Sequence, residues 1–117
     1  MKVGIDLGGS HIAIGVVDEN GRIIEKQERR ILDKEQQEIK TFIEEYIIKN
    51  IKEMSKKYKI TNIGIAIPGT VNKTSVIKSV NLNLENYNIV EALKKKINIP
   101  IKIIRTTENT TRYLGRL

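Results

Sequence analysis

The segment Asp6-Leu7-Gly8-Gly9-Ser10 combines residue types that can bind an anion. Glycine lets a ligand approach the backbone closely, and successive backbone N–H groups can form a concave phosphate site. The Ser10 hydroxyl adds a donor, whereas Asp6 would repel phosphate unless a cation lay between them. The segment therefore predicts a phosphate site with Mg²⁺ bound to Asp6 through water. The alternative is an ordinary hairpin turn, and the spacing matches neither a Walker A loop nor a dinucleotide-binding fingerprint.

Two further segments contain residue types suited to a hydroxyl-rich ligand. An apolar run that includes Gly64 ends at Pro68-Gly69, and open α/β sheets bind ligands at the edge where such strands end. The Asn-rich segment 79–84 includes Asn81, whose amide can both donate to and accept from sugar hydroxyls. Taken alone, the first segment is equally compatible with a plain turn and the second with ordinary loop composition.

A sheet must position these segments. Apolar runs at 2–7 and 12–17, the hairpin signal Asn20-Gly21 and the run 22–31 predict three strands in meander order. Asp33, with Gln36 as its capping-box partner, predicts the start of one long helix. The apolar residues of this helix recur at helical spacing and are predicted to be core: Ile39, Phe42, Ile43, Tyr46, Ile47, Ile51 and Met54.

The remaining elements complete an α/β pattern. The sequence predicts a buried strand at 62–67, a short strand at 75–78, a loop at 79–88, a basic helix at 89–97 and a strand at 101–104. A last helix is expected to begin at Thr106. The order β-β-β-α-β-α-β-α predicts one domain, residues 1–117, with a mixed five-stranded sheet and helices on its faces.

Composition narrows the functional classes. The absence of Cys excludes disulfides and thiolate metal sites, and no apolar run reaches the roughly 18 residues of a membrane span. With no signal-peptide pattern at the start, the cytoplasm is the expected location. The net charge of +7 comes mainly from dispersed lysines, and no nucleic-acid-binding motif accompanies it. We therefore expect no membrane and no specific nucleic-acid partner.

Together the motifs resemble the ROK family of bacterial sugar kinases and regulators, over roughly residues 2–104. The family opens with Asp-x-Gly-Gly-Thr, followed by a Gly-x-x-x-Pro-Gly strand end, an Asn-Leu segment and an (Ile/Leu)-Pro-(Val/Ile) strand. The matching residues are Asp6, Gly8, Gly9 and Ser10, then Gly64, Pro68 and Gly69, then Asn81 and Leu82, and finally Ile99, Pro100 and Ile101.

The resemblance implies the amino-terminal lobe of an ATP-dependent, glucokinase-like sugar kinase with a ribonuclease H-like fold of the actin/hexokinase type. The implied substrates are a hexose or N-acetylhexosamine and ATP with Mg²⁺. The turn at Gly8 and Gly9 would hold the phosphates, and Pro68-Gly69 and Asn81 would border the sugar.

The chain departs from the family after the Pro100 strand. Where the family carries Glu-Asn-Asp, with the Asp as general base, residues 105–109 read Arg-Thr-Thr-Glu-Asn. Glu108 is then the only nearby carboxylate, displaced along the chain, and a misplacement of about 1 Å can cost about 100-fold in rate. The family's zinc motif and second lobe are also absent. We therefore expect no turnover from this chain alone, and self-association through apolar surface that the missing lobe would cover.

Two other functions are compatible with the resemblance. ROK regulators carry an amino-terminal helix-turn-helix, for which the sequence leaves no room before the strand that begins at Lys2. A non-catalytic sugar-binding or assembly module is the other alternative.

Overall fold

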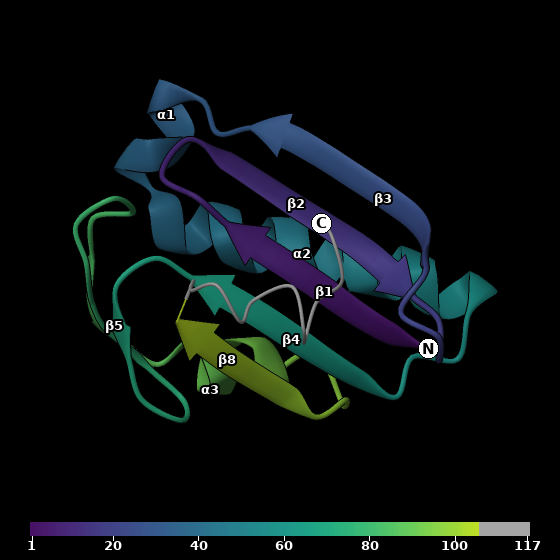
Figure 1. Ribbon diagram of the computed structural model, residues 1–117. Helices are drawn as coiled ribbons and strands as arrows, with labels where there is room; N and C mark the ends of the chain where they lie inside the picture. The colour runs from purple at the N-terminus through teal and green to yellow at the C-terminus, as the bar shows by residue number, and fades with distance from the viewer. Residues whose placement is uncertain (106–117) are drawn as a thin grey trace.

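The main sheet has five strands in the spatial order β3-β2-β1-β4-β8. The computed structural model describes residues 1–105, and Figure 1 shows the sheet with helices behind it. β1 pairs antiparallel with β2 and parallel with β4, so the sheet is mixed, as the sequence predicts. The strands are β1 (Lys2–Leu7), β2 (His11–Val17), β3 (Ile23–Arg30), β4 (Asn62–Ile67) and β8 (Ile101–Arg105).

The two faces of the sheet differ because successive side chains of a strand point to opposite faces. One face packs against helices α2 (Ile39–Lys57) and α3 (Ile89–Lys94) and carries buried Val, Ile and Leu side chains. The other face, toward the viewer in Figure 1, carries small residues. There the strand register aligns Gly15, Gly4 and Gly64 in one row across β2, β1 and β4.

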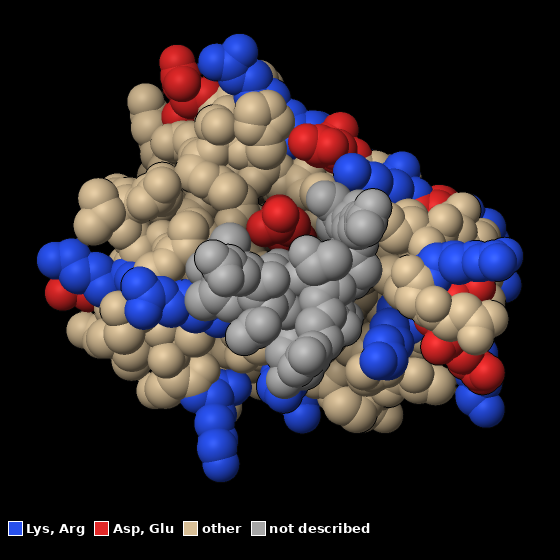
Figure 2. Space-filling model, viewed as in Figure 1, with Lys and Arg blue, Asp and Glu red and all other residues tan. Residues whose placement is uncertain are grey.

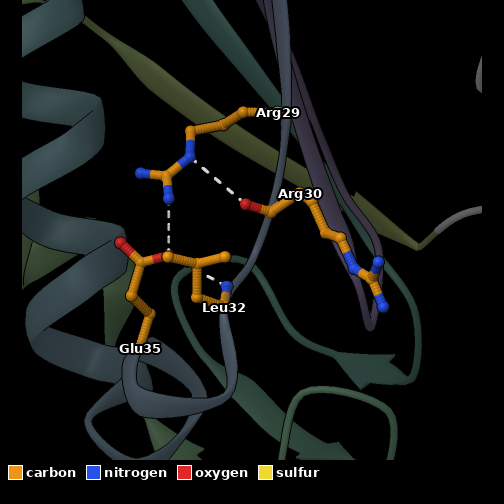
Figure 3. A network of polar contacts seen from close by, with 4 residues as sticks. All are labelled: Arg29, Arg30, Leu32 and Glu35. Carbon is orange, nitrogen blue, oxygen red and sulfur yellow. Dashed lines mark hydrogen bonds and ion pairs between the residues drawn. The ribbon is translucent and has the colours of Figure 1, made fainter.

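The first helix begins one position away from the predicted cap. The N-cap is Leu32 and not Asp33, so the capping prediction is wrong. Leucine has no side-chain acceptor; instead Glu35 Oε1 accepts the Leu32 N–H (2.9 Å) and a hydrogen bond from Arg29 Nη2 (2.6 Å), as Figure 3 shows. The backbone donor first, and Arg29 next, lower the pKa of Glu35. This network fastens the helix start to the end of β3.

The prediction of one continuous helix is also wrong. Helix α1 (Asp33–Gln37) ends at Glu38, whose φ of −126° and ψ of 52° leave the helical region, and α2 starts at Ile39. The break lets α1 turn away from the axis of α2 (Figure 1). The predicted apolar stripe is otherwise confirmed, with all its members buried in α2 except the half-buried Tyr46.

A second, three-stranded sheet follows β4, in the order β5-β6-β7. The short strand predicted at 75–78 is observed, but the loop predicted at 79–88 contains β7. Leu84 and Tyr87 are buried, and Asn83 and Asn86 adopt positive φ values of 53° and 49°, which asparagine tolerates. The strands are β5 (Thr70–Val71), β6 (Val76–Ser79) and β7 (Leu84–Tyr87).

The carboxyl-terminal predictions are met in part. Helix α3 ends at Lys94, three residues before the predicted end at Ile97, and β8 matches the predicted last strand. The helix expected from Thr106 lies outside the described residues. Within residues 1–105, no helix combines the length and apolar character needed to cross a bilayer.

Candidate functional site

The predicted site residues converge at the edge of the main sheet where β1, β4 and β8 end. These strands run parallel, and Asp6 near the end of β1 is the register partner of Ala66 near the end of β4. Arg105 at the end of β8 is the partner of Ile67. The turn after β1 and the turn after β4 therefore leave the sheet at the same edge.

Asp6 lies on the small-residue face and is half-buried. Burial raises the pKa of Asp6 most; nearby Glu28 raises it further, and Lys26 lowers it. Among residues 1–105, no hydrogen bond or ion pair compensates the Asp6 carboxylate. A half-buried carboxylate with no ion pair, and with Lys26 only as a more distant charge, has oxygen atoms free to bind a hydrated cation.

The turn after β1 is organised by its carbonyl groups. The Ser10 carbonyl accepts the Ile31 N–H at 2.7 Å, and Gln36 Nε2 donates to the Gly9 carbonyl. The Gly8 N–H closes the turn by donating to the His11 carbonyl at 2.8 Å. The carbonyl groups of Gly9 and Ser10 therefore both accept hydrogen bonds from within the protein.

The amides of the same turn remain available. Within the described part of the chain, the N–H groups of Gly9 and Ser10 have no hydrogen-bond acceptor. The Ser10 hydroxyl lies 3.0 Å from His11 Nδ1 and is exposed. Two adjacent unpaired amides with a neighbouring hydroxyl are donors that an anion could use. Gly8, the third glycine-turn residue predicted for the site, uses its amide within the turn.

Asn81 lies directly against this turn. A Cβ atom added at Gly9 would stand 3.1 Å from the Asn81 carbonyl oxygen and 3.2 Å from its Cβ, so only glycine allows this approach without displacement. Asn81 itself is exposed, in the turn between β6 and β7. Two segments more than 70 residues apart in the sequence thus meet at one point.

The Pro68-Gly69 turn has a structural role in the same region. Gly69 has a φ of 137°, and a Cβ there would overlap the carbonyl oxygen of Lys78 in β6. Glycine therefore allows the β5–β6 hairpin to fold back beside the end of β4. Ser79, buried at the end of β6, accepts the Leu82 N–H at 3.3 Å and orders the turn that carries Asn81.

One predicted site residue lies apart from this cluster. Gly64 is in the middle of β4, opposite Gly4, and not at the turn. Glu108, the only candidate for a catalytic base, lies outside the described residues. Among residues 1–105, no three His, Asp or Glu side chains gather in a way that could hold a metal ion.

Gln36 is the residue that sequence reasoning missed. Its spacing from Asp33 suggested a capping partner, but its side chain reaches the Gly9 carbonyl, 27 residues earlier in the chain. No local pattern signals such a contact, because it depends on the break at Glu38 and on the placement of α1 beside the turn.

The structure thus defines an α/β domain with a mixed sheet, and at the carboxyl edge of this sheet lies a glycine turn with two unpaired amides. The ROK family model matches residues 2–111, and the chain belongs to the ROK family. A comparison with curated proteins found no match.

Solved structures share the fold. A putative sugar kinase from Cytophaga hutchinsonii is 27% identical with a TM-score of 0.74, over 90% of this chain and 36% of that one. A ROK glucokinase from Streptomyces griseus, solved with glucose and AMPPNP, is 21% identical with a TM-score of 0.73, over 89% and 32%. A ROK transcriptional regulator homologous to E. coli MLC is 19% identical with a TM-score of 0.73, over 89% and 27%. The chain thus spans between 27% and 36% of each.

Proposed function

We propose that this chain is the amino-terminal lobe of an ATP-dependent sugar kinase, with a ribonuclease H-like fold of the actin/hexokinase type. The observation that carries the proposal is the turn whose carbonyls are tied to Gln36 and Ile31 while the amides of Gly9 and Ser10 stay unpaired, between Asp6 and Asn81. Proteins bind phosphate with hydrogen-bond donors and cations, and this turn offers the donors.

The phosphates of ATP are the ligand that suits this turn. Phosphoryl transfer depends on positioning and on stabilising negative charge, and backbone amides do both without having to reorient. Asp6 would hold Mg²⁺ through water, because a single carboxylate leaves most of the ion's coordination to water and phosphate oxygens. Bound there, the ion would neutralise phosphate charge. The raised pKa of Asp6 is the expected state of such a carboxylate before a cation reaches it.

A hexose or N-acetylhexosamine is the proposed acceptor. Asn81 is exposed, and its backbone carbonyl and Cβ lie beside Gly9, so a sugar hydroxyl bound by its amide would be close to phosphates on the turn. Pro68 and Gly69 support this arrangement by holding the β5–β6 hairpin at the strand ends. The S. griseus protein, which was solved with glucose and AMPPNP, shares this fold.

We propose binding without turnover for the chain alone. A kinase needs a base for the sugar hydroxyl, and Glu108 is the only carboxylate near the position where the family has one. The chain spans about a third of the compared kinases, so we expect the remaining part of such an enzyme to supply groups that phosphoryl transfer needs.

Titration with Mg-ADP and Mg-AMPPNP tests the proposal. In a ¹⁵N-labelled sample, we expect amide shifts centred on Gly9 and Ser10, and a several-fold gain in affinity when Mg²⁺ is added. Asp6→Asn should abolish the Mg²⁺ effect, whereas Asp18→Asn, in the β2–β3 turn, should preserve it. Nucleotide binding that leaves the amides of residues 8–10 unshifted would contradict the proposal.

A regulatory function is the second candidate, favoured by the shared fold of the MLC homologue. Figure 2 shows Lys and Arg side chains scattered around the margins of the face seen there, outside the grey area, without a continuous basic stripe. We therefore expect DNA binding, if any, to disappear by about 200 mM salt, as phosphate contacts do. A gel shift that survives this salt concentration would favour the regulator.

A further inference from the structure

A groove of about 730 Å³ lies between α2 and α3, on the helix side of the main sheet. Its apolar floor includes Ile48 from α2 and Ala92 from α3, both half-buried. The groove is open to solvent and separate from the turn at Gly9, which lies at the strand ends. The sequence analysis assigned no function to this surface.

Four lysines line the groove: Lys49 and Lys52 from α2, and Lys95 and Lys96 from the end of α3. Lys52 follows Ile48 by four residues, so the two share a face of α2. Lys95 and Lys96 directly follow the last residue of α3, and Ala92 lies in its last turn. All four lysines are exposed, and none has an acidic partner within residues 1–105.

The acidic residues of the groove do not offset this charge. Glu44 accepts a hydrogen bond from the Tyr87 hydroxyl at 2.8 Å, which directs its carboxylate toward β7. Burial and this carboxylate raise the pKa of Tyr87 far above its usual range, so the hydroxyl stays a donor. Glu45 is the one other carboxylate of the lining, against four lysines.

We propose that this groove docks an acidic amphipathic helix of a partner protein. The apolar side of such a helix would cover Ile48 and Ala92, and its Glu or Asp side chains would pair with the four lysines, which is the helix-in-groove mode of recognition. Complementary charge makes binding selective for acidic partners and raises the association rate. A second copy of this chain is a poor occupant, because its net charge is also +7. The apolar floor favours a protein helix over a nucleic-acid backbone.

A designed peptide tests the surface directly. The probe is a helical peptide of about 18 residues with Leu on one face and Glu on the other, long enough to be helical in water. Titrated into the ¹⁵N-labelled chain, it should shift amides of α2 and α3 and leave the turn at Gly9 unchanged. Its affinity should fall as salt rises, since exposed ion pairs are screened. The same peptide with Lys in place of Glu should not bind.

Variants locate the contact. The double variant Lys49→Glu/Lys95→Glu should weaken peptide binding at least about tenfold, as expected when two of the four favourable charge contacts become repulsive. Lys2→Glu carries the same kind of charge change on the opposite face of the sheet and should change binding less than about twofold. Ala92→Gln should weaken binding by filling the floor with a polar side chain.

Three results would overturn the proposal. One is an equal effect of Lys2→Glu and of either Lys49→Glu or Lys95→Glu as single variants. Another is binding of the Lys peptide as tight as that of the Glu peptide. The third is a single-stranded oligonucleotide that shifts the same amides and displaces the peptide, which would assign the groove to nucleic acid. Thermal unfolding confirms that each variant is folded, and these surface substitutions should leave the midpoint almost unchanged.

Discussion

At the scale of single residues, the candidate site contains a backbone conformation and a carboxylate environment that each cost free energy. Gly69 adopts a φ of 137°, and the half-buried Asp6 carboxylate forms no ion pair within residues 1–105. Such features persist where the surrounding structure over-determines them, and they gather at functional sites. Their placement beside the unpaired amides of Gly9 and Ser10 supports the proposed function.

Gly69→Ala should destabilise the fold by at least about 2 kcal/mol, because it combines backbone strain with overlap against the Lys78 carbonyl. Gly21→Ala is the matched control: Gly21 also has a positive φ, 79°, but an added Cβ would meet nothing within 4 Å. It should cost about 1 kcal/mol. Urea unfolding measures both, and equal losses would show that the hairpin is free to move away from Gly69.

Asp6→Asn should make the protein more stable at neutral pH. The pKa of Asp6 is raised in the folded state, so the folded protein binds a proton more tightly than the unfolded chain does. Stability therefore falls as pH rises from the ordinary aspartate pKa of about 4 through the folded pKa. The advantage of the Asn variant should be complete above this window and vanish below it. Thermal unfolding across pH measures the difference, and an Asn variant less stable at pH 7 would contradict the assignment.

The residues that touch in the site were only partly predictable from the sequence. The glycines of the first turn and Asn81 stood out by residue type, and the structure places Gly9 against Asn81. The link from Gln36 to the Gly9 carbonyl was not predictable, because it joins a helix to a turn through tertiary packing. Local patterns report conformation and exposure, but they do not report which distant backbone group a polar side chain reaches.

At the scale of elements, hydrophobic periodicity was a good guide where one face is buried. The meander of β1, β2 and β3 and the stripe of α2 follow from it. It failed for β7, where only Leu84 and Tyr87 of four residues are buried and the flanking asparagines resemble loop. It also failed at Glu38, since a helix break without Gly or Pro has no local signal.

Helix α1 holds the turn at Gly9 through the hydrogen bond from Gln36. Gln36→Ala should weaken Mg-ADP binding about two- to twelvefold, the equivalent of one hydrogen bond worth about 0.5–1.5 kcal/mol. Gln37→Ala changes an exposed neighbour in the same helix and should have no effect. Calorimetric titration measures both, and equal affinities for the two variants would show that the Gly9 carbonyl needs no support.

At the scale of the whole molecule, large apolar side chains remain exposed within the described residues. Val80, 80% exposed, stands in the turn next to Asn81, and Ile77 lies nearby on β6. We expect the chain to self-associate through such surface, with an apparent mass that rises with concentration. Val80→Ser should weaken this association several-fold in sedimentation experiments, and Ile24→Ser, on β3, is the control. A monomer at all concentrations would contradict the expectation.

The place of β1 in the middle of the sheet also governs how the protein folds. One edge of β1 pairs with β2, which ends at Val17. Its other edge pairs with β4, which starts only at Asn62. Until that later segment is available, a growing chain presents an unsatisfied row of backbone donors and acceptors along an apolar strand, and such a row is a template for pairing with other chains. Because pairing across so many residues is slow, yield during synthesis should depend on the supply of chaperones more than on the final stability of the domain.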